Sequence, residues 1–180
     1  MRIVAGEYRG RALTSPTWDG LRPTSDRLRE TLFNILGPSI TGARVLDGYA
    51  GTGAIGIEAL SRGAAHVTFV ERDARAVQLI ARNLAAIDPD GTRGRAIIRA
   101  GFADAAARFA GAPFDLIIVD PPYAHDAAAE ALAVAAGLAG AATRVVVEHA
   151  ARHAAPDAAG ALRLRRTVTA GDSALSFYER

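Results

Sequence analysis

The sequence contains no cysteine, and this absence removes two classes of site. Without thiols, the 180-residue chain can form neither disulfides nor a thiolate metal centre. The histidines do not replace them, because they show none of the spacings typical of metal ligands, and we therefore expect no metal. The four histidines are His66, His125, His149 and His153.

A long apolar run is also missing. The opening residues, MRIVAGEYRG, have no signal-peptide core, and no stretch of about 18 apolar residues without charge follows them. We therefore expect a cytoplasmic protein that does not enter a membrane. The length of 180 residues and the hydrophobic content of 50% suit one α/β domain with a single sizeable core.

Lysine is also absent, so all 21 basic residues are arginine. The net charge is only +2. In a chain so rich in alanine, this absence indicates coding bias more than function. The first 30 residues still carry a modest excess of positive charge. Arg9, Arg11 and Arg22 in this arm would contact RNA phosphates if they are functional, and are otherwise solvated surface charges.

From residue 44 onward, strand-like and helix-like stretches alternate. This alternation is typical of parallel strands joined by right-handed crossovers, with helices on both faces of the sheet. The last two strands have no helix between them and should form an antiparallel hairpin at the sheet edge. We therefore expect an α/β fold with a mostly parallel, seven-stranded sheet. The predicted strands are 43–50, 66–72, 95–100, 114–120, 143–149, 162–170 and 174–180, and the helices are 54–63, 73–87, 103–110 and 126–138.

Residues 1–43 do not follow this alternation and are predicted to form an N-terminal extension of a core at 44–180. The extension should begin with a short hairpin and continue with a helix over residues 24–36. Thr24 or Ser25 is the expected cap of this helix. Since the core does not need the extension for its own sheet, docking to a partner is its expected task.

A glycine-rich loop follows the first predicted strand of the core. In VLDGYAGTGAIG, the spacing G-x-G-x-x-G of Gly51, Gly53 and Gly56 lets the backbone approach a nucleotide-type cofactor closely. Glu71, 20 residues after Gly51, can accept both hydroxyls of a ribose, which fits NAD and S-adenosylmethionine alike. Asp47 favours S-adenosylmethionine, because a carboxylate there attracts an ammonium group and repels a pyrophosphate.

The segment FDLIIVDPPYA predicts a strand that ends abruptly in a stiff tetrad. Pro121 and Pro122 cannot donate to a sheet, and each proline fixes its own φ and restricts the residue before it. At the carboxyl edge of the sheet, the tetrad should face the glycine loop. The Asp120 carboxylate and the Pro121 carbonyl could accept both hydrogens of an exocyclic amine and direct its lone pair at a methyl group. Tyr123 would stack on the base.

Five segments together resemble the RsmD family of bacterial 16S rRNA guanine-N2 methyltransferases, over essentially the whole chain. DPPY is shared with methyltransferases that act on DNA adenine, whereas LRPTSDRLRETLFN discriminates better. The resemblance implies a Rossmann-like class I methyltransferase fold, S-adenosylmethionine as cofactor, and a guanine substrate in 16S rRNA of the small ribosomal subunit or its assembly intermediate. We expect a monomer. The segments are RIVAGEYRGRAL, LRPTSDRLRETLFNIL, VLDGYAGTGAIGIEALSRGA, DLIIVDPPY and GDSALSFYER.

The resemblance also implies roles for single residues. Thr24 and Arg29 would either reach the methionine end of the cofactor, or cap their helix and form surface ion pairs. After the third strand, Asp104 or a backbone N–H at Phe102 or Ala103 would read the adenine. The remaining cofactor residues would be Asp47, Gly51, Gly53 and Glu71, and the catalytic residues would be Asp120, Pro121, Pro122 and Tyr123.

Three other functions remain open at this point. A DNA adenine-N6 methyltransferase would need a target-recognition domain, and no segment is long enough to form one. An NAD-dependent oxidoreductase fits the glycines but leaves Asp47 and the DPPY tetrad unexplained. An RNA-binding module without catalysis would tolerate the loss of Asp120, which this chain retains.

Overall fold

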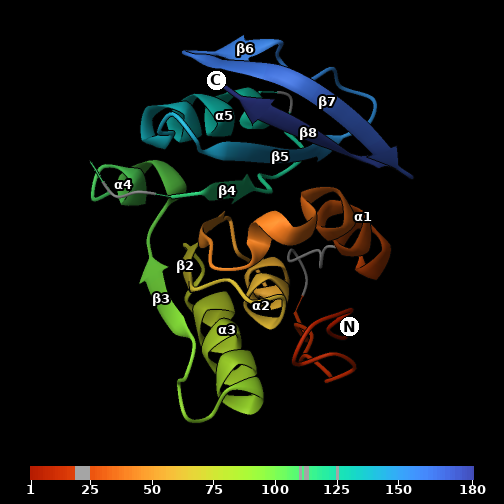
Figure 1. The fold of residues 1–180 in the computed structure, drawn as a ribbon, viewed down its shortest axis with the longest axis vertical. Helices are drawn as coiled ribbons and strands as arrows, with labels where there is room; N and C mark the ends of the chain where they lie inside the picture. The colour runs from red at the N-terminus through yellow and green to blue at the C-terminus, as the bar shows by residue number, and fades with distance from the viewer. Residues whose placement is uncertain (19–24, 110, 112–113, 125) are drawn as a thin grey trace.

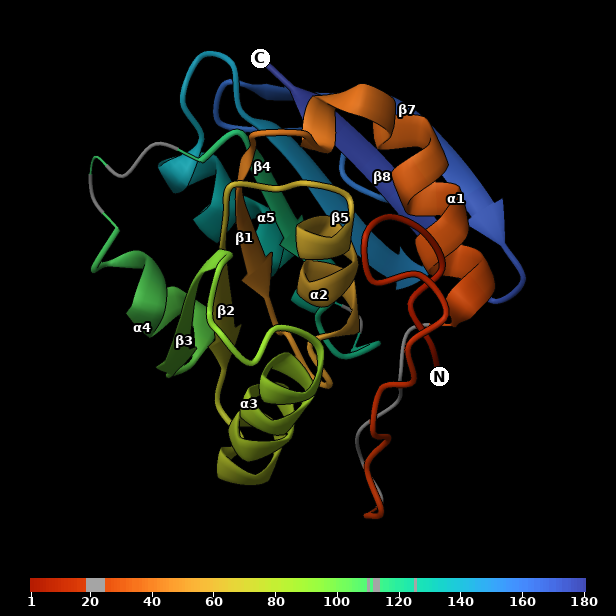
Figure 2. The same cartoon turned by 60° about the horizontal axis from the view of Figure 1, so that its bottom comes forward.

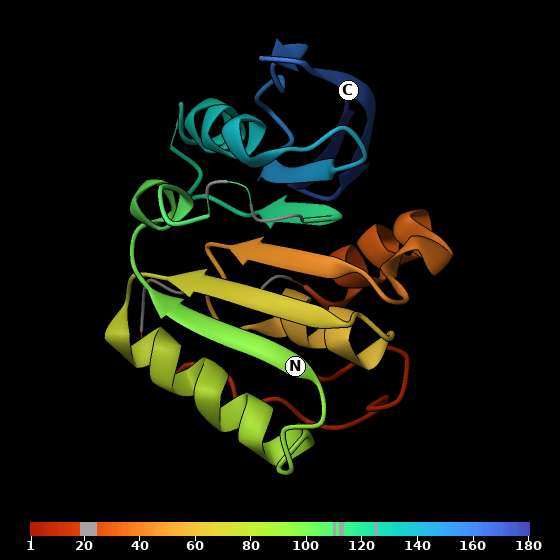
Figure 3. The ribbon, with the colours of Figure 1, turned by 60° about the vertical axis from the view of Figure 1, so that its left-hand side comes forward.

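Short runs of β-branched and apolar residues form the parallel centre of the sheet. The structure is a computed structural model that describes residues 1–18, 25–109, 111, 114–124 and 126–180. In Figure 3 the strands coloured orange, yellow and green point the same way, so their carboxyl ends meet at one edge. The parallel strands are β1 (Arg44–Gly48), β2 (His66–Glu71), β3 (Gly94–Arg99), β4 (Leu116–Val119) and β5 (Arg144–Ala150).

The C-terminal strands continue the sheet in antiparallel fashion, as predicted. β8 (Ser173–Glu179) pairs with β5 on one side and with β7 (Leu162–Ala170) on the other. Figure 1 shows these strands at the end of the sheet farthest from α3. Over the described residues the order is β3-β2-β1-β4-β5-β8-β7-β6.

The predicted number of seven strands is wrong, because the sheet in the described part of the chain has eight. The additional strand, β6 (Ala158–Ala159), is only two residues long and pairs with the start of β7. Two alanines have neither the alternation nor the β-branched side chains that identify a strand in a sequence. This strand therefore exists because it pairs with β7, and its own residues have no strong β propensity.

Helices cover both faces of the sheet, as the alternation predicted (Figure 2). Apolar side chains of three helices enter the core on one face, and those of the other two enter the core on the opposite face. The first group is α1 (Asp26–Leu36), α2 (Ala54–Ser61) and α3 (Ala74–Ile87), and the second is α4 (Phe102–Ala106) and α5 (Ala127–Leu138). A 3₁₀ turn, Gly37–Ile40, follows α1. None of the described helices has both the length and the apolar character to cross a membrane.

Side-chain caps begin two of the helices, and the first is the predicted cap Ser25. The Ser25 hydroxyl accepts a hydrogen bond from the Leu28 N–H at 3.1 Å and begins α1. The Asp73 carboxylate accepts from the Arg75 N–H at 2.7 Å and begins α3. These side chains satisfy N–H groups that have no partner inside a helix, and so they fix where each helix begins.

The first 13 residues form the predicted hairpin, although the strand pairing is limited to one bridge between Arg2 and Ala12. The hairpin is tied to α2, because the Glu58 carboxylate accepts hydrogen bonds from the Val4 and Ala5 N–H groups at 2.8 and 3.0 Å. Its apolar side chains belong to the same core cluster as those of α1 and α2. The division at residue 43 stays a prediction, since the extension and the sheet share this core.

The polarity of the sheet locates the site. β1 pairs with β2 on one side and with β4 on the other. The chain adds β2 and β3 on the first side and then crosses to add β4 and β5 on the second, so the strand order switches direction next to β1. In open α/β sheets, ligands bind outside the carboxyl ends of the strands at such a switch in strand order. The carboxyl ends of β1 and β4 are therefore the expected place for a ligand site.

Close packing of α2 on the sheet requires a glycine at position 56. A Cβ atom on Gly56 would lie 2.3 Å from the Phe69 ring and 2.9 Å from Asp47 Oδ2. Gly56→Ala should therefore lower the free energy of unfolding by about 1–3 kcal/mol, as overpacking of a core does. Thermal or urea unfolding measures this change.

A matched control is Gly137→Ala in α5, where an added Cβ meets no atom within 4 Å. The free energy of unfolding of this variant should be unchanged or higher by up to about 1 kcal/mol, because alanine has a higher helix propensity than glycine. Equal stabilities for the two variants would show that α2 does not rely on the small residue.

Candidate active site

A cleft of about 950 Å³ opens at the carboxyl edge of the sheet. Its wall includes the glycine loop after β1, the end of β2, the start of α4, the segment after β4 and the turn between β7 and β8. The cleft brings together eight of the predicted site residues. These are Gly51, Glu71, Phe102, Asp104, Asp120, Pro121, Pro122 and Tyr123.

The glycine loop is held by Glu71. Glu71 Oε2 accepts a hydrogen bond from the Gly51 N–H at 2.9 Å, and Oε1 accepts from the Asp73 N–H at 2.8 Å. Gly51 and Gly53 have φ values of 57° and 78°, in the left-handed region that glycine adopts without strain. A carboxylate has about four acceptor sites, so both oxygens of Glu71 can still accept a ligand's hydroxyls.

Asp47 lies beneath this loop and not among the residues that line the cleft. It is only 1% exposed, and its Oδ2 accepts from the Gly56 N–H at 2.9 Å. Burial raises the pKa of Asp47 from 3.8 to about 7; the Gly56 N–H opposes this shift, and the Glu71 charge adds to it. In this structure the Asp47 carboxylate shapes the loop through the Gly56 N–H, and its contact with a ligand's ammonium group stays a prediction.

One residue of the loop carries backbone strain. Tyr49 has a φ of 63°, which is uncommon for a residue other than glycine, and its side chain lines the cleft. The Tyr49 ring lies 5.4 Å from the ring of Phe102, measured between centroids. Phe102 is buried, while Asp104 in the first turn of α4 is exposed to the cleft. The three candidates for reading an adenine, Phe102, Ala103 and Asp104, therefore line this end of the cleft.

The tetrad begins one residue after the end of β4, on the cleft wall. The Tyr123 hydroxyl donates to Glu148 Oε1 at 3.0 Å and lies 2.6 Å from the Ser173 oxygen. Because a phenol has one hydrogen to donate, the Ser173 hydroxyl must donate to Tyr123. Burial, together with the nearby charges of Glu148 and Asp120, raises the pKa of Tyr123 above 10.0, although the Ser173 contact opposes the shift. The ring is therefore fixed as a neutral phenol.

The sequence analysis missed several residues of the cleft wall. Glu148 and Ser173 hold Tyr123, and Trp18 stacks on Arg75 with the guanidinium carbon 5.1 Å from the ring centroid. A signal for Glu148 was available, since it is an acid at the carboxyl end of a parallel strand, as Asp47 and Glu71 are. Trp18 and Ser173 gave no local signal.

Arg29 is not among the residues that line the cleft, and its side chain is buried and not on the surface. Its side chain is completely buried between α1 and α2, where it pairs with Asp26 at 2.5 Å and with Glu58 at 3.4 Å. It also donates to the Arg2 carbonyl at 2.8 Å. Helical spacing could reveal the Asp26 pair, but Glu58 is 29 residues away and only the fold brings it close.

Two of the predicted RNA-contacting arginines, Arg9 and Arg11, are described, and they lie away from the cleft. Arg9 is exposed in the hairpin turn, and Arg11 donates from Nη1 to the Ile87 carbonyl at 2.7 Å. Ile87 ends α3, and a crossover helix runs antiparallel to its strands, so this contact is at the edge opposite the cleft. Arg22 and Thr24 lie outside the described residues.

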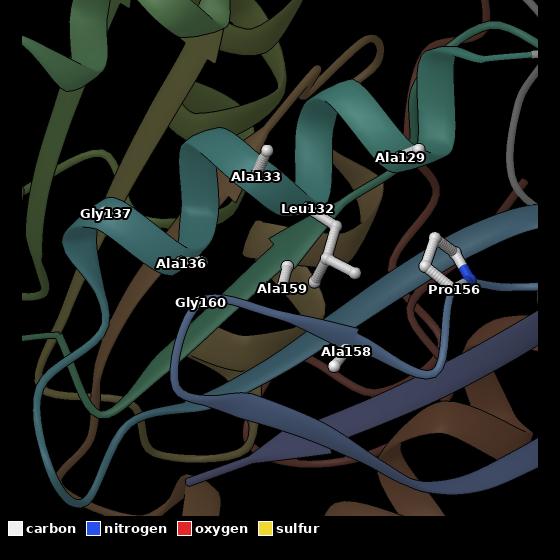
Figure 4. A pocket seen from close by; sticks show the side chains of 9 residues that line it. All are labelled: Ala129, Leu132, Ala133, Ala136, Gly137, Pro156, Ala158, Ala159 and Gly160. Carbon is white, nitrogen blue, oxygen red and sulfur yellow. The ribbon is translucent and has the colours of Figure 1, made fainter.

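A second hollow, of about 480 Å³, lies between α5 and β6 (Figure 4). Its wall offers no ionisable side chain and no hydroxyl, so it has no group to orient a polar ligand. No cluster of three or more possible metal ligands occurs among the residues that the structure describes. The lining residues are Ala129, Leu132, Ala133, Ala136, Gly137, Pro156, Ala158, Ala159 and Gly160.

Comparison with known proteins agrees with this geometry. Residues 1–179 match the family model described as conserved hypothetical protein 95. The ribosomal RNA small subunit methyltransferase D of Escherichia coli K12 is 36% identical, over 100% of this chain and 90% of the relative. The enzyme of the same name from Haemophilus influenzae is 39% identical, over 74% of this chain and 69% of the relative.

The chain belongs to the RsmD family. A solved methyltransferase from E. coli superposes with a TM-score of 0.83 at 36% identity, and the match covers 100% of this chain and 97% of that one. The rRNA methyltransferase AviRa from Streptomyces viridochromogenes has a TM-score of 0.71 at 17% identity, over 89% of this chain and 87% of that one. This more distant likeness shows the fold alone, which is that of a class I methyltransferase.

The raised pKa of Asp47 predicts how stability depends on pH. Between pH 3.8 and about 7, the folded protein binds a proton at Asp47 that the unfolded chain has released. The stability contributed by this group is therefore present at acid pH and is lost as the pH rises, by an amount on the order of 4 kcal/mol.

Asp47→Asn should remove this loss, because an amide oxygen still accepts from the Gly56 N–H without becoming charged. At pH 8 the variant should be more stable than the wild type, and at pH 4 the two should be similar. Urea unfolding of the ligand-free protein across this pH range measures the difference. Parallel pH profiles would show that Asp47 ionises as it does in the unfolded chain.

Proposed function

We propose that this protein transfers a methyl group from S-adenosylmethionine to the exocyclic N2 amine of a guanine in 16S rRNA. The observation that carries the proposal is one cleft that contains both the glycine loop with Glu71 and the tetrad that begins at Asp120. Membership of the RsmD family supports rRNA as the substrate, since named relatives are ribosomal RNA small subunit methyltransferases.

The cleft fits this cofactor in size and in chemistry. Its volume, about 950 Å³, is at the upper end of the usual range for small-molecule sites and leaves room for a base beside the cofactor. In the proposed binding mode, Glu71 accepts the ribose hydroxyls, and the backbone at Gly51 and Gly53 lies close to the ligand. Phe102 and Asp104 lie against the adenine. S-adenosylmethionine supplies a methyl group bound to a positively charged sulfur.

The tetrad prepares the amine for attack. The nitrogen lone pair of an exocyclic amine is delocalised into the base, which makes the amine a weak nucleophile. If Asp120 and the Pro121 carbonyl accept its two hydrogens, the nitrogen becomes more pyramidal and its lone pair points at the methyl carbon. The prolines keep these acceptors in place, and such orientation can lower the barrier by several kcal/mol.

The electron balance of the transfer is simple. N2 of the guanine forms a bond to the methyl carbon while the carbon–sulfur bond breaks, and the electron pair of that bond stays on sulfur. The methylated nitrogen, now positively charged, releases one proton to water. Tyr123 stacks on the base, and its hydroxyl is held by Glu148 and Ser173, so the ring cannot swing away.

Nucleoside mass spectrometry tests the proposal. Small ribosomal subunits from a strain that lacks the enzyme are incubated with the protein and isotope-labelled S-adenosylmethionine, and the digested RNA is analysed. We expect labelled N2-methylguanosine. Label in adenosine would support an adenine methyltransferase instead, and absence of label from all nucleosides would refute the proposal.

For the tetrad, we expect Asp120→Ala to lower the methyl-transfer rate at least ~10²-fold, as removal of one preorganised polar group typically does. S-adenosylmethionine affinity, measured by calorimetry, should stay within a few-fold. Asp120→Asn should be milder, because the amide oxygen still accepts an N–H. If Asn and Ala were equally inactive, Asp120 would have to take the proton itself, and full activity of the Ala variant would exclude the tetrad from the reaction.

We also propose that the N-terminal hairpin helps to dock the RNA through Arg9. This side chain is exposed, and it can therefore neutralise a phosphate. Arg9→Ala should weaken binding to the small subunit and reduce the salt slope of log affinity by about 0.7–0.9 units, with unchanged thermal stability. Filter binding at several salt concentrations measures the slope.

Arg11→Ala provides the comparison within the same hairpin. It removes the hydrogen bond to the Ile87 carbonyl and the contact of the guanidinium with the Tyr8 ring, 5.4 Å from the centroid. It should therefore lower stability by about 0.5–1.5 kcal/mol. If Arg9→Ala bound the small subunit normally at every salt concentration, Arg9 would be a solvated surface charge without a role in docking.

A further inference from the structure

Glu148 lies beside Asp120 at the carboxyl edge of the sheet. Val119 and Val147 are register partners in the parallel pair of β4 and β5, and Asp120 and Glu148 each follow by one residue. Glu148 is only 4% exposed, and it lines the same cleft as the tetrad. The two carboxylates therefore belong to adjacent strand ends at one site.

The two oxygens of the Glu148 carboxylate differ. Oε1 accepts the Tyr123 hydroxyl at 3.0 Å, whereas Oε2 is buried and has no hydrogen-bond partner among the described residues. A buried oxygen without a donor costs free energy, and native structures retain such atoms where a ligand or a function accounts for them. Because Glu148 faces the cleft, the missing donor can come from the substrate.

We propose that Glu148 selects guanine over adenine by accepting, at Oε2, the N1–H hydrogen of the target base. This inference rests on the proposed function and names the group that gives it base specificity. Glu148 is a specificity residue in this role, while Asp120 and the Pro121 carbonyl act on the neighbouring amine.

The donor pattern of the two purines supports this assignment. Guanine carries hydrogens on N1 and on the adjacent N2 amine, so its edge presents a row of donors to two neighbouring carboxylates. Adenine has a bare N1, whose lone pair would face the lone pairs of the carboxylate oxygen, and this mismatch disfavours adenine. A site built to accept a hydrogen strongly rejects a base that lacks it, because its own acceptor then stays unpaired.

The contacts of Tyr123 give the carboxylate a fixed direction. The Tyr123 hydroxyl donates to Oε1 and is itself held by Ser173 at 2.6 Å, so Oε1 already has a donor while Oε2 has none among the described residues. Glu148→Gln should keep the bond to Tyr123 through its carbonyl oxygen. Its amide NH₂ then replaces Oε2, which changes the acceptor into a donor without a change of size.

The test compares guanine with 2-aminopurine, which keeps the 2-amino group but has a bare N1. After the modified guanine is located, small subunits are reconstituted with ligated 16S rRNA that carries either base at that single position. The wild type should methylate guanine roughly 10- to 100-fold faster than 2-aminopurine. Glu148→Gln should lower this ratio at least ~10-fold, because its NH₂ can donate to the bare N1.

Tyr123→Phe is the matched control, because it removes a contact of Glu148 but leaves the carboxylate. It should slow both substrates while it preserves a clear preference for guanine. If Glu148→Gln does not bind S-adenosylmethionine in calorimetry, Glu148→Ala replaces it, and the ratio should then approach one.

Three results are decisive. A wild-type enzyme that methylates both bases at similar rates overturns the inference, as does a ratio that Glu148→Gln or Glu148→Ala leaves unchanged, since a structural role would slow both bases alike. A wild-type enzyme that methylates neither base would instead refute the proposed function. A falling ratio with measurable guanine activity supports both.

Discussion

The close approach of α2 to the ends of β1 and β2 is the constraint on which the site depends. At Gly56 the helix backbone comes so near the Phe69 ring that no Cβ fits, and the Gly56 N–H donates to the buried Asp47 carboxylate. This contact fixes where the loop between β1 and α2 turns. The loop in turn places the Gly51 N–H against Glu71. A conventional helix packed farther from the sheet would leave no cleft of this shape.

A second buried carboxylate attaches the N-terminal segment to the same helix. Glu58 is completely buried, and it accepts hydrogen bonds from two hairpin N–H groups and from the guanidinium groups of Arg29 and Arg62. Removing Glu58 would take from the buried Arg29 guanidinium its one buried counter-charge among the described residues, and breaking such a pair typically costs several kcal/mol. The hairpin, α1 and the helix behind the glycine loop are therefore coupled. The extension supports the site although its described residues form no strand of the sheet.

The sequence predicts the strand and helix pattern well, because periodicity and capping are local. Asp73 and Ser25 begin their helices as their side-chain chemistry requires, and the tetrad ends β4 because proline cannot continue it. What could not be predicted depends on residues far apart. The partner of Arg29 is 29 positions away, and β6 exists only because β7 lies beside it.

Several carboxylates lie at the carboxyl edge of the sheet, and their surroundings differ. Asp47, Glu71, Asp120 and Glu148 all stand at or just beyond the ends of parallel strands, where like charges repel. Burial raises the pKa of Asp47 to about 7, so this acid is partly neutral, and two backbone N–H groups compensate Glu71. Glu148 keeps one buried oxygen without a partner among the described residues. Such an edge favours a ligand that carries positive charge or many hydrogen-bond donors. The proposed S-adenosylmethionine offers an ammonium group and ribose hydroxyls, and the proposed guanine offers its N1–H and N2 amine.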